Sequence, residues 1–319
     1  AESKLFGLRT TSSSHSYMVY QTRSAESGQG RMVVAVGDPS AAEDLLTMAA
    51  RFAQKKNFEL ECVHVIVVDK SKDPSETQVS DSIGRRISNT AEKLGMKFKI
   101  PVHTNVRVAH DVGHAMAEAI MDRDADIFLM RYSSYKRGNQ SDSIVQTVLK
   151  STNCEVILVN SVKNIFENSK VVIPVGSYID HSVPVEIGKV FEDGNCSIQI
   201  MDVHESLSDT EDSAIFDTSF DQLKKQFNVP IKAISTEAPS PMKLLSVIND
   251  DDSLDVLILG MPRKSLLKSM HKTSFKRTLS KVNNCTVIIT ASKYEKIYKR
   301  DLSGEDCNSF KRRPICLLE

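Results

Sequence analysis

The chain has 319 residues and a formal net charge of zero, with apolar and charged fractions that are ordinary for a soluble globular protein. This length predicts about two domains of roughly 150 residues each. The balanced charge argues against a nucleic-acid-binding protein. No apolar run reaches the ~18 residues of a membrane-spanning helix, and the start lacks the apolar core of a secretory signal.

The six cysteines include no C-x-x-C pair, and four of them lie in or beside apolar runs. Buried, reduced thiols are therefore expected, and neither a disulfide framework nor a metal-binding cluster is predicted.

Residues 1–30 are rich in Ser, Thr, Gly and Gln and are predicted to form a linker or arm, with an apolar patch at Tyr17–Tyr20 that could dock on a domain. Alternating apolar runs and helical patterns follow over residues 31–162. We expect strands at 32–36, 60–68, 99–108, 127–130 and 156–159, and helices at 41–54, 78–94 and 111–123 with one more between the last two strands. Gly95 is expected to stop the second helix.

Residues 168–292 repeat this alternation. The strands are expected at 170–175, 197–203, 230–234, 256–259 and 286–290, and the helices at 180–192, 212–227, 241–249 and 271–281. Strands that alternate with helices predict βαβ units and a parallel sheet. Residues 293–319 are expected to be a charged tail.

Two stretches of the chain resemble each other and indicate an internal duplication. Residues 125–160 and 254–290 each begin with an acidic residue before an apolar run, Asp126 and Asp255. Each ends with an Asn-Cys pair before a second apolar run, at Asn153-Cys154 and Asn284-Cys285. A repeat of this length predicts two copies of one structural unit.

Each unit resembles a universal stress protein domain. The resemblance rests on the stretch VAVGDPSAAEDLLTMAARFA, on the VHV of the second strand, and on the ADIFLM…NCEVILV and LDVLILG…NCTVIIT endings. It implies an α/β fold class with two tandem five-stranded, mainly parallel sheets and flanking helices, packed as a pseudo-dimer. Because a bare fifth strand would expose unpaired backbone groups, we expect Glu155–Val159 to pair with Val287–Thr290.

A narrower resemblance concerns the segment Val106–Val112 followed by ADIFLMRYSS. It is similar to the tandem stress-protein-like domain at the cytosolic C-terminus of transporters of the amino-acid–polyamine–organocation superfamily, which includes cation-chloride cotransporters and amino-acid permeases. This implies a non-enzymatic regulatory or assembly domain on the cytoplasmic side of the cell membrane. The implied partners are its own transmembrane domain and a second copy in a homodimer, without nucleic acid and without direct membrane insertion.

Nucleotide-binding stress proteins carry an acidic residue after the first strand and the pattern G-x2-G-x9-G-[ST] after the fourth, where glycines let backbone N–H groups approach phosphates. In the second unit Gly260 keeps the first glycine, Arg263 replaces the second, and Thr273-Ser274 replace the final pair. Gly176 stands at the acidic position. A degenerate nucleotide site at Gly260, Arg263, Thr273 and Ser274 is the alternative hypothesis, and no cofactor is expected.

In the first unit the pattern is weaker. Arg131 and Ser134 replace the two glycines, Asp142-Ser143 replace the last pair, and Gly37 stands at the acidic position. Asp142 near a helix N-terminus would repel a phosphate. In the second unit, four lysines lie near Arg263 in the sequence (Lys264, Lys268, Lys272 and Lys276). These basic residues could bind an anion together, or they could form a solvated face.

No catalytic or metal-binding set emerges from the remaining residues. His110 and His114 have the spacing of a helical zinc site, but Asp111 stands where a helix N-cap belongs, so His110 would precede the helix. No Ser-His-Asp or Cys-His pairing is predicted. Three hypotheses therefore remain: a transporter regulatory domain, a nucleotide sensor, and a free-standing stress protein with weak nucleotide hydrolysis. The missing glycines and acidic residue disfavour the third.

Overall fold

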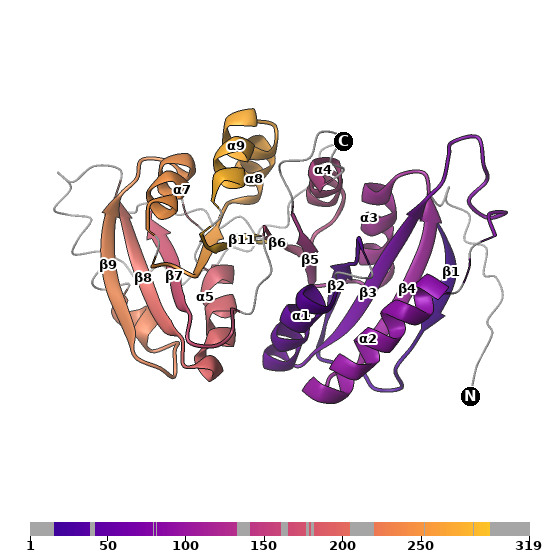
Figure 1. Cartoon of the computed structure of the whole chain (residues 1–319), viewed down its shortest axis with the longest axis horizontal. Helices are drawn as coiled ribbons and strands as arrows, with labels where there is room; N and C mark the ends of the chain where they lie inside the picture. The colour runs from indigo at the N-terminus through magenta and orange to yellow at the C-terminus, as the bar shows by residue number, and fades with distance from the viewer. Residues whose placement is uncertain are drawn as a thin grey trace, which may run out of the picture.

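One continuous sheet of eleven strands runs through the described part of the chain (Figure 1). The computed structural model describes residues 16–38, 42–78, 80, 82–132, 141–160, 165–176, 179, 182–204, 220–251, 253–282 and 284–293. The strand order is β1-β4-β3-β2-β5-β6-β11-β10-β7-β8-β9. We call β1 to β6 with their helices the N-terminal half, and β7 to β11 with theirs the C-terminal half.

The N-terminal half follows the predicted alternation of strands and helices. Its apolar runs become buried parallel strands, because side chains on both faces of such a strand meet covering helices. Its elements are β1 (Ser16–Thr22), β2 (Gly30–Ala35), α1 (Glu43–Lys56), β3 (Phe58–Val67), α2 (Ser82–Phe98), β4 (Val102–Ala109), α3 (Val112–Asp122), β5 (Ile127–Arg131), α4 (Ser141–Ser151) and β6 (Glu155–Val159).

The C-terminal half has the same strand order, with β8 and β9 on one side of β7 and β10 and β11 on the other. Its described elements are β7 (Lys170–Gly176), α5 (Ser182–Gly188), the 3-10 helix η2 (Lys189–Gly194), β8 (Ser197–His204), β9 (Ile231–Glu237), α7 (Pro241–Asn249), β10 (Val256–Gly260), α8 (Arg263–Met270), α9 (Thr273–Lys281) and β11 (Thr286–Ala291). Residues 220–224 are also helical, and the rest of the helix predicted at 212–227 lies largely outside the described residues.

The two halves join through an antiparallel pair of strands at the centre of the sheet. Strand β6 pairs with β11 in the register Val159 to Ile288 and Val156 to Ala291. The predicted pairing of these strands is confirmed. The expectation of two separate five-stranded sheets is wrong, because the pairing that protects both fifth strands also fuses the sheets into one.

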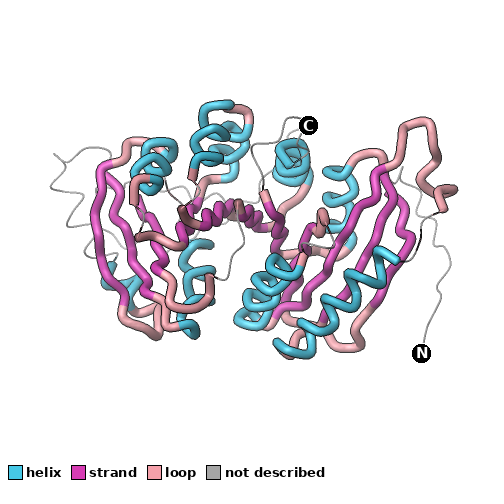
Figure 2. Tube along the Cα trace, in the orientation of Figure 1, coloured by secondary structure: helices cyan, strands magenta, loops and turns pink. Residues whose placement is uncertain are grey.

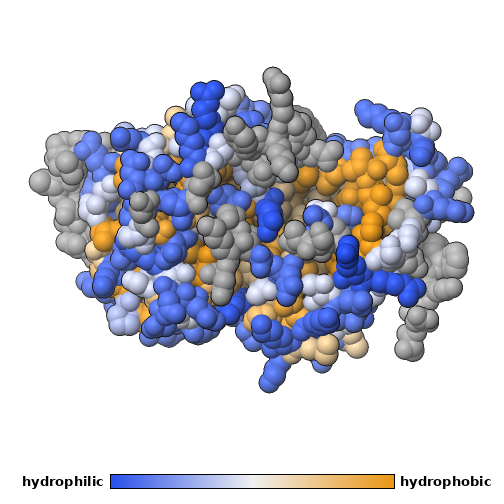
Figure 3. All heavy atoms as spheres, viewed as in Figure 1, coloured by the Kyte–Doolittle hydropathy of each residue, from blue (hydrophilic) through white to orange (hydrophobic). Residues whose placement is uncertain are grey.

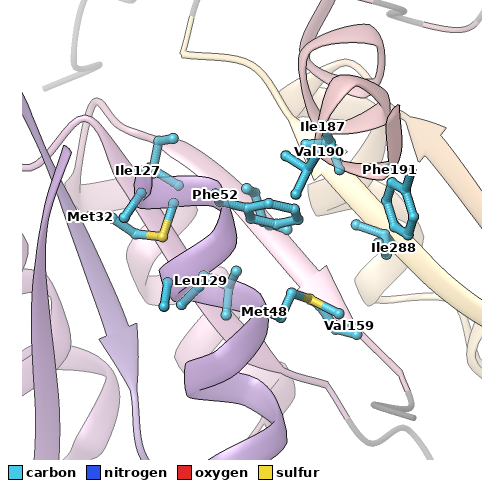
Figure 4. Packing of buried hydrophobic residues seen from close by; sticks show 14 of the residues in the cluster. Met32, Met48, Phe52, Ile127, Leu129, Val159, Ile187, Val190, Phe191 and Ile288 are labelled. Atoms are coloured by element: carbon cyan, nitrogen blue, oxygen red, sulfur yellow. The ribbon is translucent and has the colours of Figure 1, made fainter. Parts of the chain in front are cut away.

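Helices cover both faces of the sheet and enclose two apolar layers (Figures 1 and 2). One layer lies against α1, α2 and α5, and the other against α3, α4, α7, α8 and α9. Both layers extend across the junction. Figure 4 shows Phe52 of α1 directed toward Ile187 and Val190 of the C-terminal half, and all three are buried. Within the described residues, no helix has the length and apolar character needed to span a bilayer.

Two expectations about the N-terminal half are wrong. Residues 16–22 of the predicted arm form β1 and pair antiparallel with β4, so the patch at Tyr17–Tyr20 does dock on the domain, but as a strand of the sheet and not as a linker. Residues 1–15 lie outside the described residues. Gly95 does not stop the second helix, which continues to Phe98 and ends where Lys99 adopts a left-handed φ of 54°. A Cβ at Gly95 would lie 2.8 Å from the Cγ2 of Val102, so this glycine serves close packing of α2 on β4.

Candidate functional site

The candidate nucleotide site begins at the carboxyl end of β10. Gly260 is buried there, and the N–H of Met261 donates to the carbonyl of Thr290 at 2.9 Å. The segment predicted to be a phosphate loop is mostly helical, since α8 begins at Arg263 and α9 begins at Thr273. The single helix expected at 271–281 is therefore the second of two.

The side chain of Arg263 points into the N-terminal half. Its guanidinium donates to the carbonyl oxygens of Leu149 (2.9 Å), Cys154 (2.8 Å), Val148 (3.2 Å) and Thr152 (2.6 Å). The residue is only 5% exposed. The interpretation of Arg263 as part of a solvated basic face is therefore wrong, and its donors are already used by backbone carbonyls.

The chemistry of a helix end explains this contact. The last carbonyls of a helix lack intrahelical partners and carry the negative end of the helix dipole. These carbonyls of α4 and of the turn after it meet the planar fork of five N–H donors that an arginine presents. Burial lowers the pKa of the Arg263 guanidinium. Arg263 thus caps the C-terminal end of α4 from the opposite half of the molecule.

The N-terminal end of α4 is also held by the C-terminal half. Asp142, in the first turn of α4, accepts a hydrogen bond from the Tyr132 hydroxyl at 2.6 Å and pairs with the ammonium of Lys276 on α9 at 2.6 Å. Burial raises the pKa of Tyr132, and Asp142 raises it further. The ammonium of Lys276 is half-buried in this ion pair, so the C-terminal half anchors α4 at both ends.

The remaining candidate residues do not converge with Arg263. Thr273 and Ser274 are exposed in the first turn of α9, and Lys264, Lys268 and Lys272 are exposed as well. A Cβ at Gly176 would already lie 2.7 Å from the carbonyl oxygen of Val203, so the acidic position has no room for a carboxylate. A phosphate cradle is therefore not assembled from the predicted residues in the described part of the C-terminal half.

In the N-terminal half, the residues at the positions equivalent to the nucleotide loop do not form a phosphate site either, as far as the structure describes them. Arg131 is exposed at the end of β5. Gly37 is exposed too, and a Cβ added to it would meet no other atom within 4 Å. Ser134 lies outside the described residues. Asp142, expected to repel a phosphate, is already committed to Lys276.

A shallow groove lies away from the carboxyl ends of these strands, between α1 and α5. Its walls are mainly apolar and come from both halves, with Phe52 and Val190 facing each other across it (Figure 4). Lys56 and Glu186 form an ion pair at 3.6 Å at its edge. This groove therefore belongs to the packing between the halves.

The histidines at 110 and 114 are explained by helix capping. Asp111 is the N-cap of α3, as predicted, and its carboxylate accepts from the backbone N–H of His114 at 2.8 Å. The His114 ring also contacts Asp111, while the His110 ring lies 3.4 Å from the carbonyl of Val68. No group of three potential metal ligands occurs among the described residues.

A buried ionic network on β3 and β4 was not predicted from the sequence. Glu59 and Glu61 pair with Arg123 at 2.6 and 2.5 Å, and His103 lies 3.6 Å from Glu59. Burial lowers the pKa of His103. Burial also acts to raise the pKa of Glu59, but the N–H of Gly28 and the nearby cations outweigh it, and the net pKa is lowered. Two glutamates at alternate positions of the apolar strand β3, Glu59 and Glu61, were the sequence signal for this network, since alternate residues of a strand lie on the same face of the sheet.

Comparisons with known proteins agree with this architecture. Residues 29–160 match the model of the universal stress protein family. No curated protein matches the sequence. A putative universal stress protein from Pseudomonas aeruginosa UCBPP-PA14 has a TM-score of 0.56 at 11% identity, covering 82% of this chain and 93% of its own. A functionally unknown protein from P. aeruginosa PAO1 also has a TM-score of 0.56, at 13% identity over 83% of this chain and 94% of its own. These structural likenesses concern the fold alone.

Proposed function

We propose that this chain, which holds a universal stress protein domain at residues 29–160, is a non-enzymatic regulatory and assembly domain of a secondary membrane transporter. The transporter would be of the cation-chloride cotransporter or amino-acid permease type suggested by the segment around Val106–Val112. The domain would lie on the cytoplasmic side of the membrane.

One observation supports an assembly role most directly. Arg263, at the position of a phosphate-loop glycine, is buried and caps α4 of the other half with four hydrogen bonds. A residue committed in this way is not available to a nucleotide. The part of the family fold that binds phosphate elsewhere serves here to hold the two halves together.

The same packing favours a mechanism based on rigid-body docking. The sheet is continuous through β6 and β11, and ion pairs join the halves on both faces, with Lys55 and Lys56 of α1 on one face and Lys276 on the other. Such a unit would act by contacting its transmembrane domain, or a second copy of itself, differently in two transport states. A contact that differs between two states biases their equilibrium.

A thermal-shift titration with ATP, ADP, AMP and cyclic dinucleotides tests the proposal against nucleotide sensing. A ligand that binds only the folded chain adds about 2.7 kcal/mol of stability at one hundred times its dissociation constant. We expect no shift at millimolar nucleotide. A shift that is lost in Thr273→Ala/Ser274→Ala would overturn the proposal in favour of a sensor.

The choice of variant follows from the structure. Arg263→Ala is unsuitable for this titration because its loss would destabilise the interface between the halves. Thr273 and Ser274 are exposed, so their removal leaves the packing intact. Determining the coding sequence upstream of residue 1 provides a separate test, since a transporter domain requires membrane-spanning segments in the same chain.

A further inference from the structure

The hairpin of α8 and α9, residues 263–281, concentrates positive charge in a chain whose net charge is zero. No Asp or Glu occurs between residues 256 and 294. The hairpin itself carries seven lysines and arginines (Arg263, Lys264, Lys268, Lys272, Lys276, Arg277 and Lys281). Although the whole chain is neutral, the hairpin therefore carries a strong local excess of positive charge.

The structure divides these cations into two groups. Arg263 and Lys276 point toward α4 and are used in the interface between the halves. The others are exposed, and for four of them no carboxylate of the described residues lies within 4.0 Å (Lys268, Lys272, Arg277 and Lys281). We call these four residues the basic face.

The chemistry around the basic face narrows the class of partner. Phe275 and Leu279 of α9 are buried against the sheet, and the exposed neighbours of the four cations are polar, including Ser265, Thr273 and Ser274. The upper edge of the molecule over α8 and α9 is mainly hydrophilic (Figure 3). Because the core of a protein–protein interface is depleted in charge and enriched in aromatic residues, this surface is poorly suited to a protein partner.

We propose that the basic face binds the anionic headgroups of phospholipids at a membrane surface. This inference rests on the proposed function, which places the domain beside a membrane. Clusters of four or more basic residues on an amphipathic helix are attracted to anionic lipid surfaces. With its apolar side buried in the domain, the hairpin holds the domain against headgroups electrostatically and inserts nothing into the bilayer.

Vesicle sedimentation tests the inference with the complete 319-residue chain. Vesicles of phosphatidylcholine alone are compared with vesicles containing about one third phosphatidylserine, at about 0.1 M and about 0.5 M salt. We expect binding only to the anionic vesicles and only at the lower salt. Because each basic residue contributes about fivefold to such binding, Lys268→Gln/Lys272→Gln/Arg277→Gln/Lys281→Gln should weaken it several hundredfold.

A matched control carries the same charge change on other surfaces. Four exposed lysines are replaced by glutamine, and this variant should bind the anionic vesicles nearly as well as the natural chain (Lys70, Lys72, Lys93 and Lys232). Equal losses in both variants, salt-insensitive binding, or no binding at the lower salt would overturn the inference. Tighter binding to duplex DNA than to the vesicles would also overturn it.

The outcome is separable from that of the proposed function. If the upstream sequence encodes membrane helices and the vesicles do not bind, the transporter proposal survives and the lipid contact fails. If the vesicles bind through the basic face and no membrane helices precede the domain, the chain is a peripheral membrane protein of another kind.

Discussion

Replacing Arg263 should weaken the attachment of the C-terminal half to α4. Arg263→Met keeps most of the length and apolar volume of the side chain and removes all of its donors. Four carbonyl oxygens, of Val148, Leu149, Thr152 and Cys154, then lose a hydrogen bond in a buried place.

The magnitude follows from two opposing contributions. A hydrogen bond from a charged donor contributes about 1.5–3 kcal/mol, which would give roughly 6–12 kcal/mol for four bonds. Burying the guanidinium costs several kcal/mol and cancels much of this gain. The substitution leaves neutral carbonyls behind, and a buried acceptor left unsatisfied costs about 1–3 kcal/mol. Val148 keeps the N–H and the hydroxyl of Thr152 as donors, so three carbonyls carry the cost and we expect a loss of about 3–5 kcal/mol in the free energy of unfolding.

Urea unfolding followed by circular dichroism measures the loss, with the denaturant slopes compared between variants to check that the same surface unfolds. Lys268→Ala is the control on the same helix, because Lys268 is exposed, and it should change stability by less than about 0.5 kcal/mol. A loss below about 1 kcal/mol for Arg263→Met at unchanged slope would refute the argument, because water would then satisfy these carbonyls as well as the arginine does.

Three other variants test further parts of the structure. A double-mutant cycle on Asp142→Asn and Lys276→Gln should give a coupling free energy of about 0.5–1 kcal/mol, since the pair is partly exposed. The pKa of His103 is lowered in the folded chain, so the unfolded chain binds a proton at this residue more readily as pH falls below about 6.5. The free energy of unfolding should therefore decrease in this range, and His103→Asn should make the decrease smaller. Gly194→Ala should cost about 1–3 kcal/mol, because its Cβ would collide with the carbonyl oxygen of Phe166.

Each of these has a clear contrary result. A coupling near zero would show that the Asp142–Lys276 pair is not formed in solution. An unchanged pH profile in His103→Asn would place the acid-sensitive group elsewhere. Gly37→Ala is the control for Gly194→Ala, because nothing lies within 4 Å of its added carbon, and equal effects of the two substitutions would contradict the packing argument.

The strands other than β1 were predictable because each apolar run has a local cause. A stretch such as Val156–Val159 can be satisfied only inside a sheet covered on both faces. The N-cap at Asp111 was likewise visible, since a capping side chain acts within three residues of its own position. The β6–β11 pairing could also be inferred, because an uncovered edge is unfavourable in any arrangement of the two units.

Other features depended on contacts between distant residues. The role of Gly95 is set by Val102 in the next strand, so its position near a helix end was misleading. Residues 16–22 looked like a linker because their pairing partner, β4, lies more than eighty residues further along the chain. Glu59 and Glu61 form ion pairs with Arg123 only because α3 packs on the sheet and brings its C-terminal end next to β3.

The sequence by itself determined the alternation of strands and helices, the likeness of the two units and the loss of the glycines that phosphate binding requires. Only the tertiary structure decided what replaced that site. In the local sequence, Arg263 is one of several basic residues with no feature that sets it apart. The direction of its side chain is decided by the carbonyls at the end of α4, which lie more than one hundred residues earlier in the chain. A buried charge takes whichever partners the assembled fold brings within reach, and for Arg263 they belong to the other half of the molecule.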